Sequence, residues 1–123
     1  MYICVDFDGT CVEHVYPSVG KSVGAEKWLS LFVNHDAKLI LWTMRSGLQL
    51  DEAVAWFSNK GIPLYGINEN PSQYSWTSSP KAYGNIYIDD AAIGCPLIEN
   101  KYGRPYVDWE VVGPVVMEKL KNT

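Results

Sequence analysis

This sequence has no long apolar run, no cluster of basic residues and only three cysteines. Each of these features argues against a class of protein. A membrane-spanning helix needs about 18 or more consecutive apolar residues. No stretch of the chain provides them, so we expect no membrane partner. A formal net charge of −4 without a dense Lys/Arg run argues against a protein that binds nucleic acid through electrostatic attraction.

The three cysteines, Cys4, Cys11 and Cys95, form an odd set without metal-ligand spacing, which favours a reducing compartment over a disulfide framework. The sequence opens on a strand-like segment and shows no charged start followed by the apolar stretch of a secretory signal. We therefore expect a cytoplasmic protein. Cys4 is expected in a strand core. Cys11 and Cys95 lie near acidic residues, where a reactive thiol is an alternative to simple packing.

Length and composition indicate one ordinary folded domain. The chain has 123 residues, of which 47% are hydrophobic and 20% are charged. These values are typical of a globular domain with a single core, and no repeat or biased tract interrupts the sequence. We therefore expect one domain spanning residues 1–123.

Four short runs rich in Ile, Leu, Val and aromatic residues predict buried strands at residues 2–5, 38–42, 62–66 and 85–88. Apolar residues at helical spacing fall between and after these runs. The three expected helices contain Trp28, Leu31 and Phe32 after Gly24; Leu50, Ala53, Val54 and Phe57; and Trp109, Val112, Val116 and Leu120. Gly113 and Pro114 are expected to kink or shorten the third helix.

The second helix has sequence features typical of both of its ends. Ser46 and Gln49 fit a capping box, in which each side chain bonds the backbone of the other residue. Asp51 and Glu52 suit the first turn, where the helix dipole favours negative charge. Gly61 marks the expected end of the helix.

Strands that alternate with helices through short connections are typical of a parallel sheet. The pattern predicts an α/β domain with a three-layer Rossmann-like fold, in which helices cover both faces of the sheet. Ligands of such sheets bind outside the carboxyl ends of the strands, and the expected strands are followed by Asp6, Thr43 and Asp89. We therefore expect the functional site at that edge.

Two acidic pairs follow expected strands: Asp6 with Asp8, and Asp89 with Asp90. If the two strands are neighbours, these carboxylates converge and repel one another unless a proton or a metal ion neutralises them. Hard oxygen ligands favour Mg²⁺. The alternative for the first pair is an ordinary turn, because Asp side chains often bond nearby backbone groups.

The order of these residues resembles the haloacid dehalogenase (HAD) superfamily of phosphatases. The segment Asp6-Phe7-Asp8-Gly9-Thr10 is similar to the first motif of that family, and Thr43, after an apolar strand, to the second. Lys81 is similar to the third motif and Asp89-Asp90 to the fourth. The four elements occur in family order between residues 2 and 90.

The resemblance implies a mechanism and a cofactor. Asp6 would be the nucleophile that forms an aspartyl-phosphate, and Asp8 would protonate the leaving oxygen and then activate water. Mg²⁺ would be held by Asp6, by Asp89 and by the backbone carbonyl of Asp8. Asp90 would be a further ligand or an outer neighbour of the ion, or would instead bond the turn formed by residues 91–94.

Thr43 and the residues after it form the expected phosphate site. The Thr43 hydroxyl and backbone N–H groups such as that of Met44, at the approach to a helix, would bind the phosphate of the substrate. Arg45 could add a charge-assisted contact to the substrate. The alternatives are a simple strand end for Thr43 and a solvated surface side chain for Arg45.

Lys81 would bind substrate and offset the repulsion among Asp6, the phosphate and Asp89. It precedes Asp89 by only eight residues, which leaves little room for a helix that would carry the lysine. The alternative is an ordinary surface lysine after Ser79 and Pro80.

Two segments are expected to flank the site. His14 could contact substrate from a mobile flap formed by residues 11–23, or lie in a solvated loop. In the loop of residues 68–80 and just after it, Tyr74, Trp76 and Tyr83 could stack on a base or a sugar, or pack against the sheet. Neither segment is long enough for a cap domain, so we expect an open site.

The sequence therefore predicts a capless, Mg²⁺-dependent phosphomonoesterase that acts on a nucleotide, a sugar or another small phosphate ester, including a terminal phosphate on an oligonucleotide. A partner subunit could close the site, so an oligomer is compatible. The alternatives are a phospho-accepting receiver module and a catalytically inactive protein that binds phosphate or metal. A receiver would carry its accepting Asp on a middle strand, where this chain has Thr43.

Overall fold

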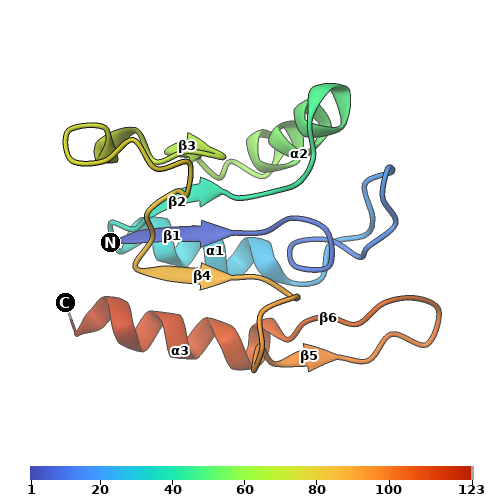
Figure 1. Cartoon of the computed structure of the whole chain (residues 1–123). Helices are drawn as coiled ribbons and strands as arrows, with labels where there is room; N and C mark the ends of the chain where they lie inside the picture. Colours follow the sequence, from blue (N-terminus) through green and yellow to red (C-terminus); the bar gives the residue numbers. More distant parts are fainter. Residues whose placement is uncertain (123) are drawn as a thin grey trace.

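In the computed structural model, which describes residues 1–122, strands and helices alternate along most of the chain (Figure 1). The main sheet contains β1 (Tyr2–Val5), β2 (Lys38–Leu41), β3 (Gly66–Ile67) and β4 (Ile86–Ile88). A two-stranded sheet contains β5 (Leu97–Ile98) and β6 (Tyr106–Val107). The helices are α1 (Ala25–Asn34), α2 (Gly47–Asn59), α3 (Trp109–Lys121) and a 3₁₀ turn, η1 (Pro71–Gln73). None of the described helices has the length and apolar character needed to cross a bilayer.

The main sheet is parallel throughout and has the strand order β3-β2-β1-β4. β1 is a central strand, because Val5 is in register both with Leu41 of β2 and with Ile88 of β4. The carboxyl ends of these three strands therefore lie side by side. β4 joins the free side of β1, so the direction in which strands are added reverses after β3. The predicted α/β domain with a parallel sheet is confirmed.

All three α-helices cover the same face of the main sheet. They share one buried core with alternate residues of the strands, and this core includes Ile3, Val5, Leu39, Leu41, Phe32 of α1, Phe57 of α2 and Val116 of α3. Phe7 continues this face beyond β1, and its ring centroid lies 5.8 Å from that of Trp56 on α2. The predicted helices on both faces are not found in residues 1–122, because the connection from β3 to β4 is a loop, as predicted for residues 68–80, and contains only the turn η1.

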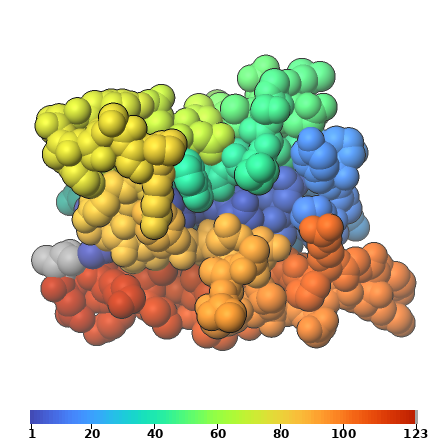
Figure 2. All heavy atoms as spheres, viewed as in Figure 1, coloured from blue at the N-terminus to red at the C-terminus, as the bar shows by residue number. Residues whose placement is uncertain are grey.

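A loop of residues 68–85 covers the opposite face of the sheet. In Figure 2 the yellow and gold atoms of this loop lie in front of the blue atoms of β1. Cys4 and Ile40, which alternate with the residues of the helical core, form a second, smaller cluster beneath this loop. The buried side-chain amides of Asn70 and Gln73 bond backbone groups within the loop and give it a defined shape.

The predicted strands at residues 2–5, 38–42 and 85–88 are confirmed to within one residue at each end. The third strand is displaced and consists of Gly66 and Ile67. Pro63 has no N–H for a sheet ladder. Ile62 packs in the helical core, and the chain reaches the edge of the sheet only after that point.

The predicted start of α2 is right in position and wrong in detail. Ser46 is the residue before the helix and has an extended backbone, but it makes no side-chain capping bond, so the predicted capping box is absent. Asp51 lies beyond the first turn, which contains no acidic residue. Gly61 follows the helix with a φ of 70°, so the predicted end is confirmed.

Helix α3 is continuous from Trp109 to Lys121, although a kink or a shorter helix was predicted at Gly113 and Pro114. A missing proline N–H near the start of a helix removes one backbone bond, and packing on a neighbouring helix can compensate for it. Gly113 provides that packing, because a Cβ at this position would overlap the ring of Trp28 on α1. The glycine therefore allows α3 and α1 to approach closely.

We expect Gly113→Ala to lower the free energy of unfolding by about 1–3 kcal/mol, because the added methyl group forces Trp28 out of its position. Urea denaturation would measure this change. The loss should occur even though alanine is a better helix former than glycine by up to about 1 kcal/mol. Val115→Ala, at a side chain of the same helix that is 53% exposed, is the control and should change stability by less than about 0.5 kcal/mol. Equal effects of the two substitutions would contradict the packing argument.

Candidate functional site

Polar side chains follow all four strands of the main sheet. Asp6 follows β1, Thr43 follows β2, Asn68 follows β3, and Asp89 and Asp90 follow β4. At this edge a cleft of about 500 Å³ is lined by Asp6, Asp8, His14, Tyr16, Thr43, Met44, Arg45, Asp89, Asp90, Ala91 and Arg104. A cleft therefore lies at the carboxyl ends of the strands, where the sequence predicts the functional site.

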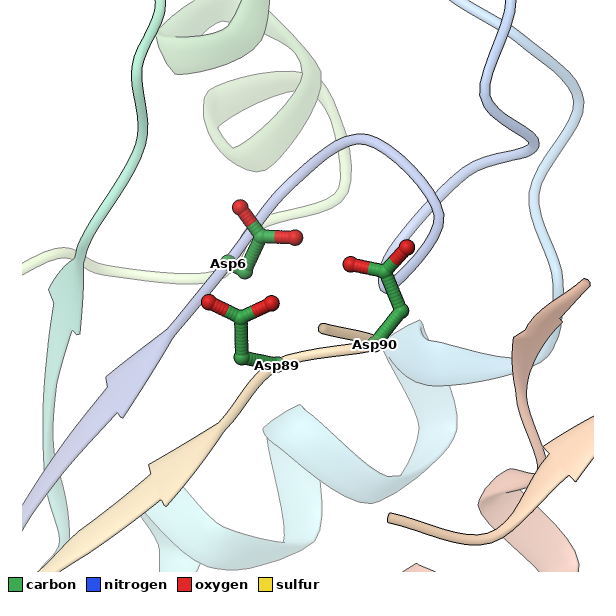
Figure 3. Close-up of side chains that lie close together, drawn as sticks. All are labelled: Asp6, Asp89 and Asp90. Carbon is green, nitrogen blue, oxygen red and sulfur yellow. The ribbon is translucent and has the colours of Figure 1, made fainter. Parts of the chain in front are cut away.

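Three of the predicted metal residues form one cluster. Asp6, Asp89 and Asp90 each offer a carboxylate oxygen, and these oxygens lie within 4.8 Å of one another. Figure 3 shows the three side chains, Asp6 from the end of β1 and the other two from the end of β4. A set of carboxylate oxygens at this spacing fits the ligand preference of Mg²⁺. The donor set is therefore compatible with the predicted ion.

The electrostatics of the cluster also favour a cation. Burial raises the pKa of Asp6 from 3.8 to about 8, and the charge of Asp89 and a hydrogen bond with Asp90 add to the effect. Burial likewise raises the pKa of Asp89. These carboxylates therefore resist ionising together, and a divalent cation would favour their ionised forms.

Thr10 joins the two acidic segments. Its fully buried hydroxyl donates to Asp6 Oδ2 at 2.9 Å and accepts from the backbone N–H of Asp90 at 3.1 Å. Gly9, with a φ of 80°, turns beneath the Asp90 carboxylate, where a Cβ would overlap the oxygens. The Gly-Thr pair thus fixes how closely the end of β4 approaches the end of β1.

Residues of β6 and α3 bond the backbone of the turn that contains Gly9 and Thr10. The N–H of Val107 on β6 donates to the carbonyl of Gly9 at 3.0 Å. The indole Nε1 of Trp109, at the start of α3, donates to the carbonyl of Thr10 at 2.7 Å. Because Trp109 is 2% exposed, this bond is shielded from water. Sequence reasoning placed no function on these residues.

Asp8 faces Arg45 and not the three clustered carboxylates. Arg45 Nε donates to Asp8 Oδ2 and Nη2 donates to Asp8 Oδ1, each at 2.8 Å. A two-point pair of this kind holds a carboxylate in one orientation. The side chain of Asp8 is therefore separate from the acidic cluster of Asp6, Asp89 and Asp90, and a metal contact of this residue would fall to its backbone carbonyl.

Arg45 does not have the environment that was predicted for a substrate contact, nor that of a solvated surface residue. Only 1% of its side chain is exposed. In addition to the carboxylate, it donates to the backbone carbonyls of Pro17, Ser18 and Gln49. Its guanidinium nitrogen atoms are thus already bonded within the protein.

Thr43 and Met44, the predicted phosphate site, carry hydrogen-bond donors that face no described partner. The N–H of Thr43 donates to Asn68 Oδ1 at 2.8 Å, and its hydroxyl accepts from the N–H of Arg45 at 3.1 Å. Among the described residues, neither the Thr43 hydroxyl proton nor the Met44 N–H has a partner. Both donors are therefore available to an anion just before the start of α2.

Lys81 is a correction to the prediction. It does not line the cleft, and its ammonium lies over the ring of Tyr87, 5.2 Å from the ring centroid. The side chain is exposed. The short segment between Lys81 and Asp89 keeps the lysine on the loop that covers the sheet. The structure therefore places Lys81 as the surface lysine of the alternative interpretation.

The predicted flanking residues divide into two groups. His14 and Tyr16, on segment 11–23, line the cleft, whereas Tyr74, Trp76 and Tyr83 are absent from its lining. Trp76 instead packs edge-on against Tyr83.

Sequence reasoning missed Asn68 and Arg104. Asn68 follows its strand as Thr43 does and would have been found if β3 had been placed correctly. Arg104, in the connection between β5 and β6, follows no pattern that marks it.

The cysteines are packing residues. All three are free, and Cys4 and Cys11 are buried. Burial raises the pKa of Cys4 to about 11 and also raises the pKa of Cys11 and of Cys95. The reactive thiolate is therefore disfavoured at each position, and the alternative of a reactive Cys11 or Cys95 receives no support.

The solved structure of a conserved protein from Bacteroides thetaiotaomicron is similar to this chain. The two share 35% sequence identity with a TM-score of 0.79, over 97% of this chain and 91% of the other. No family model matches the sequence, and no curated protein matches it.

We expect Asp89→Asn to raise the melting temperature of the metal-free protein, because it removes one of the three clustered charges. The substitution should also reduce the stabilisation by Mg²⁺, which for a ligand at 100 times its Kd is about 2.7 kcal/mol. Thermal unfolding with and without Mg²⁺ would measure both effects.

Asp51→Asn removes an exposed carboxylate on α2 and is the matched control for this experiment. It should respond to Mg²⁺ as the wild type does. If Asp89→Asn responds to Mg²⁺ as strongly as Asp51→Asn, the cluster does not bind the ion.

Proposed function

We propose that this chain, which belongs to the same family as the conserved protein from Bacteroides thetaiotaomicron, is an Mg²⁺-dependent phosphomonoesterase of the HAD type. The observation that carries the proposal is the cleft in which three clustered carboxylates share a wall with the Thr43 hydroxyl and the Met44 N–H. Acidic clusters alone are common on protein surfaces. Their combination with unpaired donors at the approach to a helix favours phosphate as the ligand.

Asp6, Asp89 and Asp90 are the residues that would hold the ion, together with the carbonyl of Asp8. When bound, Mg²⁺ neutralises and orients the oxygens of a phosphate group. The proposal is supported by the donor set and by the raised pKa of Asp6, which indicates carboxylate charge that the described residues leave uncompensated.

Asp6 is the proposed nucleophile. In the first step an Asp6 oxygen forms a bond to phosphorus while the bond from phosphorus to the leaving oxygen breaks, and Asp8 gives its proton to that oxygen. In the second step Asp8 takes a proton from water, whose oxygen attacks the aspartyl-phosphate, releases phosphate and restores Asp6. Thr43 and the Met44 N–H donate to the phosphate oxygens in both steps.

The site is proposed to work without a cap domain. The connection between β1 and α1 is a loop, and the connection between β3 and β4 contains only the turn η1. His14, Tyr16 and Arg104 line the cleft beside the acidic cluster and would contact the part of the substrate beyond the phosphate. A nucleotide, a sugar phosphate or a phosphorylated end of an oligonucleotide could all enter such a site. Three free cysteines are consistent with a cytoplasmic protein.

The decisive measurement is phosphate release from a panel of phosphorylated metabolites, nucleotides and end-phosphorylated oligonucleotides, with and without Mg²⁺. We expect multiple turnovers with Mg²⁺ on at least one of these classes. We expect Asp6→Asn to lower kcat by about 10³-fold or more, because an amide oxygen cannot form the intermediate.

Asp51→Asn is again the control and should retain full activity, since the side chain is exposed on α2. Mg²⁺-dependent turnover that survives in Asp6→Asn would rule out the nucleophile assignment. A stable phosphoprotein that forms once and does not turn over would favour the receiver module, and inactivity across the whole panel would favour a binding protein.

A further inference from the structure

Arg45 is a buried residue whose contacts the proposed reaction does not yet use. Its guanidinium makes five hydrogen bonds, two to the carboxylate of Asp8 and three to backbone carbonyls. The carbonyls belong to Ser18 at 2.7 Å, to Gln49 at 3.1 Å and to Pro17 at 3.3 Å. Three separate parts of the chain thus meet at one side chain: the turn after β1, segment 11–23 and the first turn of α2.

Two aromatic rings also contact the guanidinium. The Cζ atom of Arg45 lies 5.1 Å from the ring centroid of Phe7 and 5.2 Å from that of Tyr16. Phe7 is fully buried and belongs to the core, whereas Tyr16 is 54% exposed and belongs to segment 11–23. Both contacts favour a flat cation at this position. The contact with Phe7 therefore fixes Arg45 against the core, and the contact with Tyr16 links Arg45 to segment 11–23.

Segment 11–23, which we call the flap, is closed at its base by its own backbone. The N–H of Glu13 donates to the carbonyl of Lys21 at 2.8 Å, and the N–H of Val23 donates to that of Cys11 at 3.3 Å. The tip, residues 14–20, is different. Its hydrogen bonds to the rest of the described chain all come from Arg45.

We propose that Arg45 is a positioning residue that fixes the flap and the Asp8 carboxylate in one arrangement. His14 and Tyr16 of the flap line the same cleft as Asp8, so one guanidinium sets both the acid-base group and a wall of the cleft. The consequence for catalysis rests on the proposed phosphatase function. The link between Arg45 and the flap rests on the contacts alone.

The chemistry of the guanidinium explains why this position needs arginine. One edge of the planar group, Nε with Nη2, matches the two oxygens of Asp8, and the remaining N–H groups reach the three carbonyls. Lysine carries the same charge but has three donors on a single atom, so it cannot bond the carboxylate at two points and the flap at the same time. Asp8 in turn accepts two of the five hydrogen bonds that this buried guanidinium donates.

The first test is the exchange of backbone amide hydrogens, measured by mass spectrometry in the wild type and in Arg45→Lys. We expect the amides of the flap to exchange at least about tenfold faster in the variant, while those of α3 stay as protected as in the wild type. Unchanged protection of the flap would overturn the proposal.

Tyr16→Ala is a second variant in case Arg45→Lys does not fold, because the side chain is half exposed and only the ring over the guanidinium is lost. It should also speed exchange in the flap. Tyr102→Ala, at a tyrosine that is 90% exposed in the β5–β6 connection, is its control and should leave the flap unchanged. Equal exchange in the flap of Tyr16→Ala and Tyr102→Ala would overturn the proposal as well.

The second test compares two substrates in Arg45→Lys. For an alkyl phosphate, whose leaving oxygen needs the proton from Asp8, we expect kcat to fall about 10²-fold. For p-nitrophenyl phosphate, which releases a stable anion, the fall should be much smaller, and KM should change by less than about threefold for both. An equal loss of kcat on the two substrates would show that Arg45 does not position Asp8. If the wild type is inactive across the whole panel of phosphate esters, the phosphatase function is refuted, and the exchange experiment alone decides the role of Arg45 in the flap.

Discussion

The whole site depends on the parallel pairing of β1 with β2 on one side and with β4 on the other. Val5 stands beside Leu41 in the register of the sheet, so the neighbouring strands end at the same level. Because polar residues follow each strand, this backbone constraint places Asp6, Thr43 and Asp89 around one cleft. A strand at the edge of the sheet would have a single neighbour and could bring together only two of the three.

The same strand pairing brings several carboxylates close together, and only one of them, Asp8, has an ion-pair partner among the described residues. Asp8 is paired with a buried arginine. Asp6, Asp89 and Asp90 form no ion pair with the described residues, and Thr10 offers one hydroxyl to the group. Full compensation would make the cluster inert towards cations and towards phosphate. Partial compensation leaves the cluster with the negative charge that the proposed Mg²⁺ would neutralise.

Sequence reasoning found the residues that follow strands and failed where partners are set by irregular segments. Asp6 and Asp89 could be predicted because short apolar runs mark the ends of β1 and β4. Arg45 was predicted to contact substrate because it follows Thr43, yet its partners come from a flap without periodic pattern. Helices on both faces of the sheet were predicted because expected strands and helices alternate along the sequence. Residues 68–80 were predicted as a loop, but no periodic pattern marks the buried amides that hold this segment over the sheet.

The bond from Trp109 to the carbonyl of Thr10 joins residues 99 positions apart. A ribosome that adds about 5–20 residues per second makes the turn of residues 6–10 roughly 5–20 s before it makes this tryptophan. Throughout that interval the nascent chain carries Asp6, Asp8 and Thr10 without the β6 and α3 residues that support their turn. The order of synthesis therefore makes the last helix of the described chain the element that completes the site.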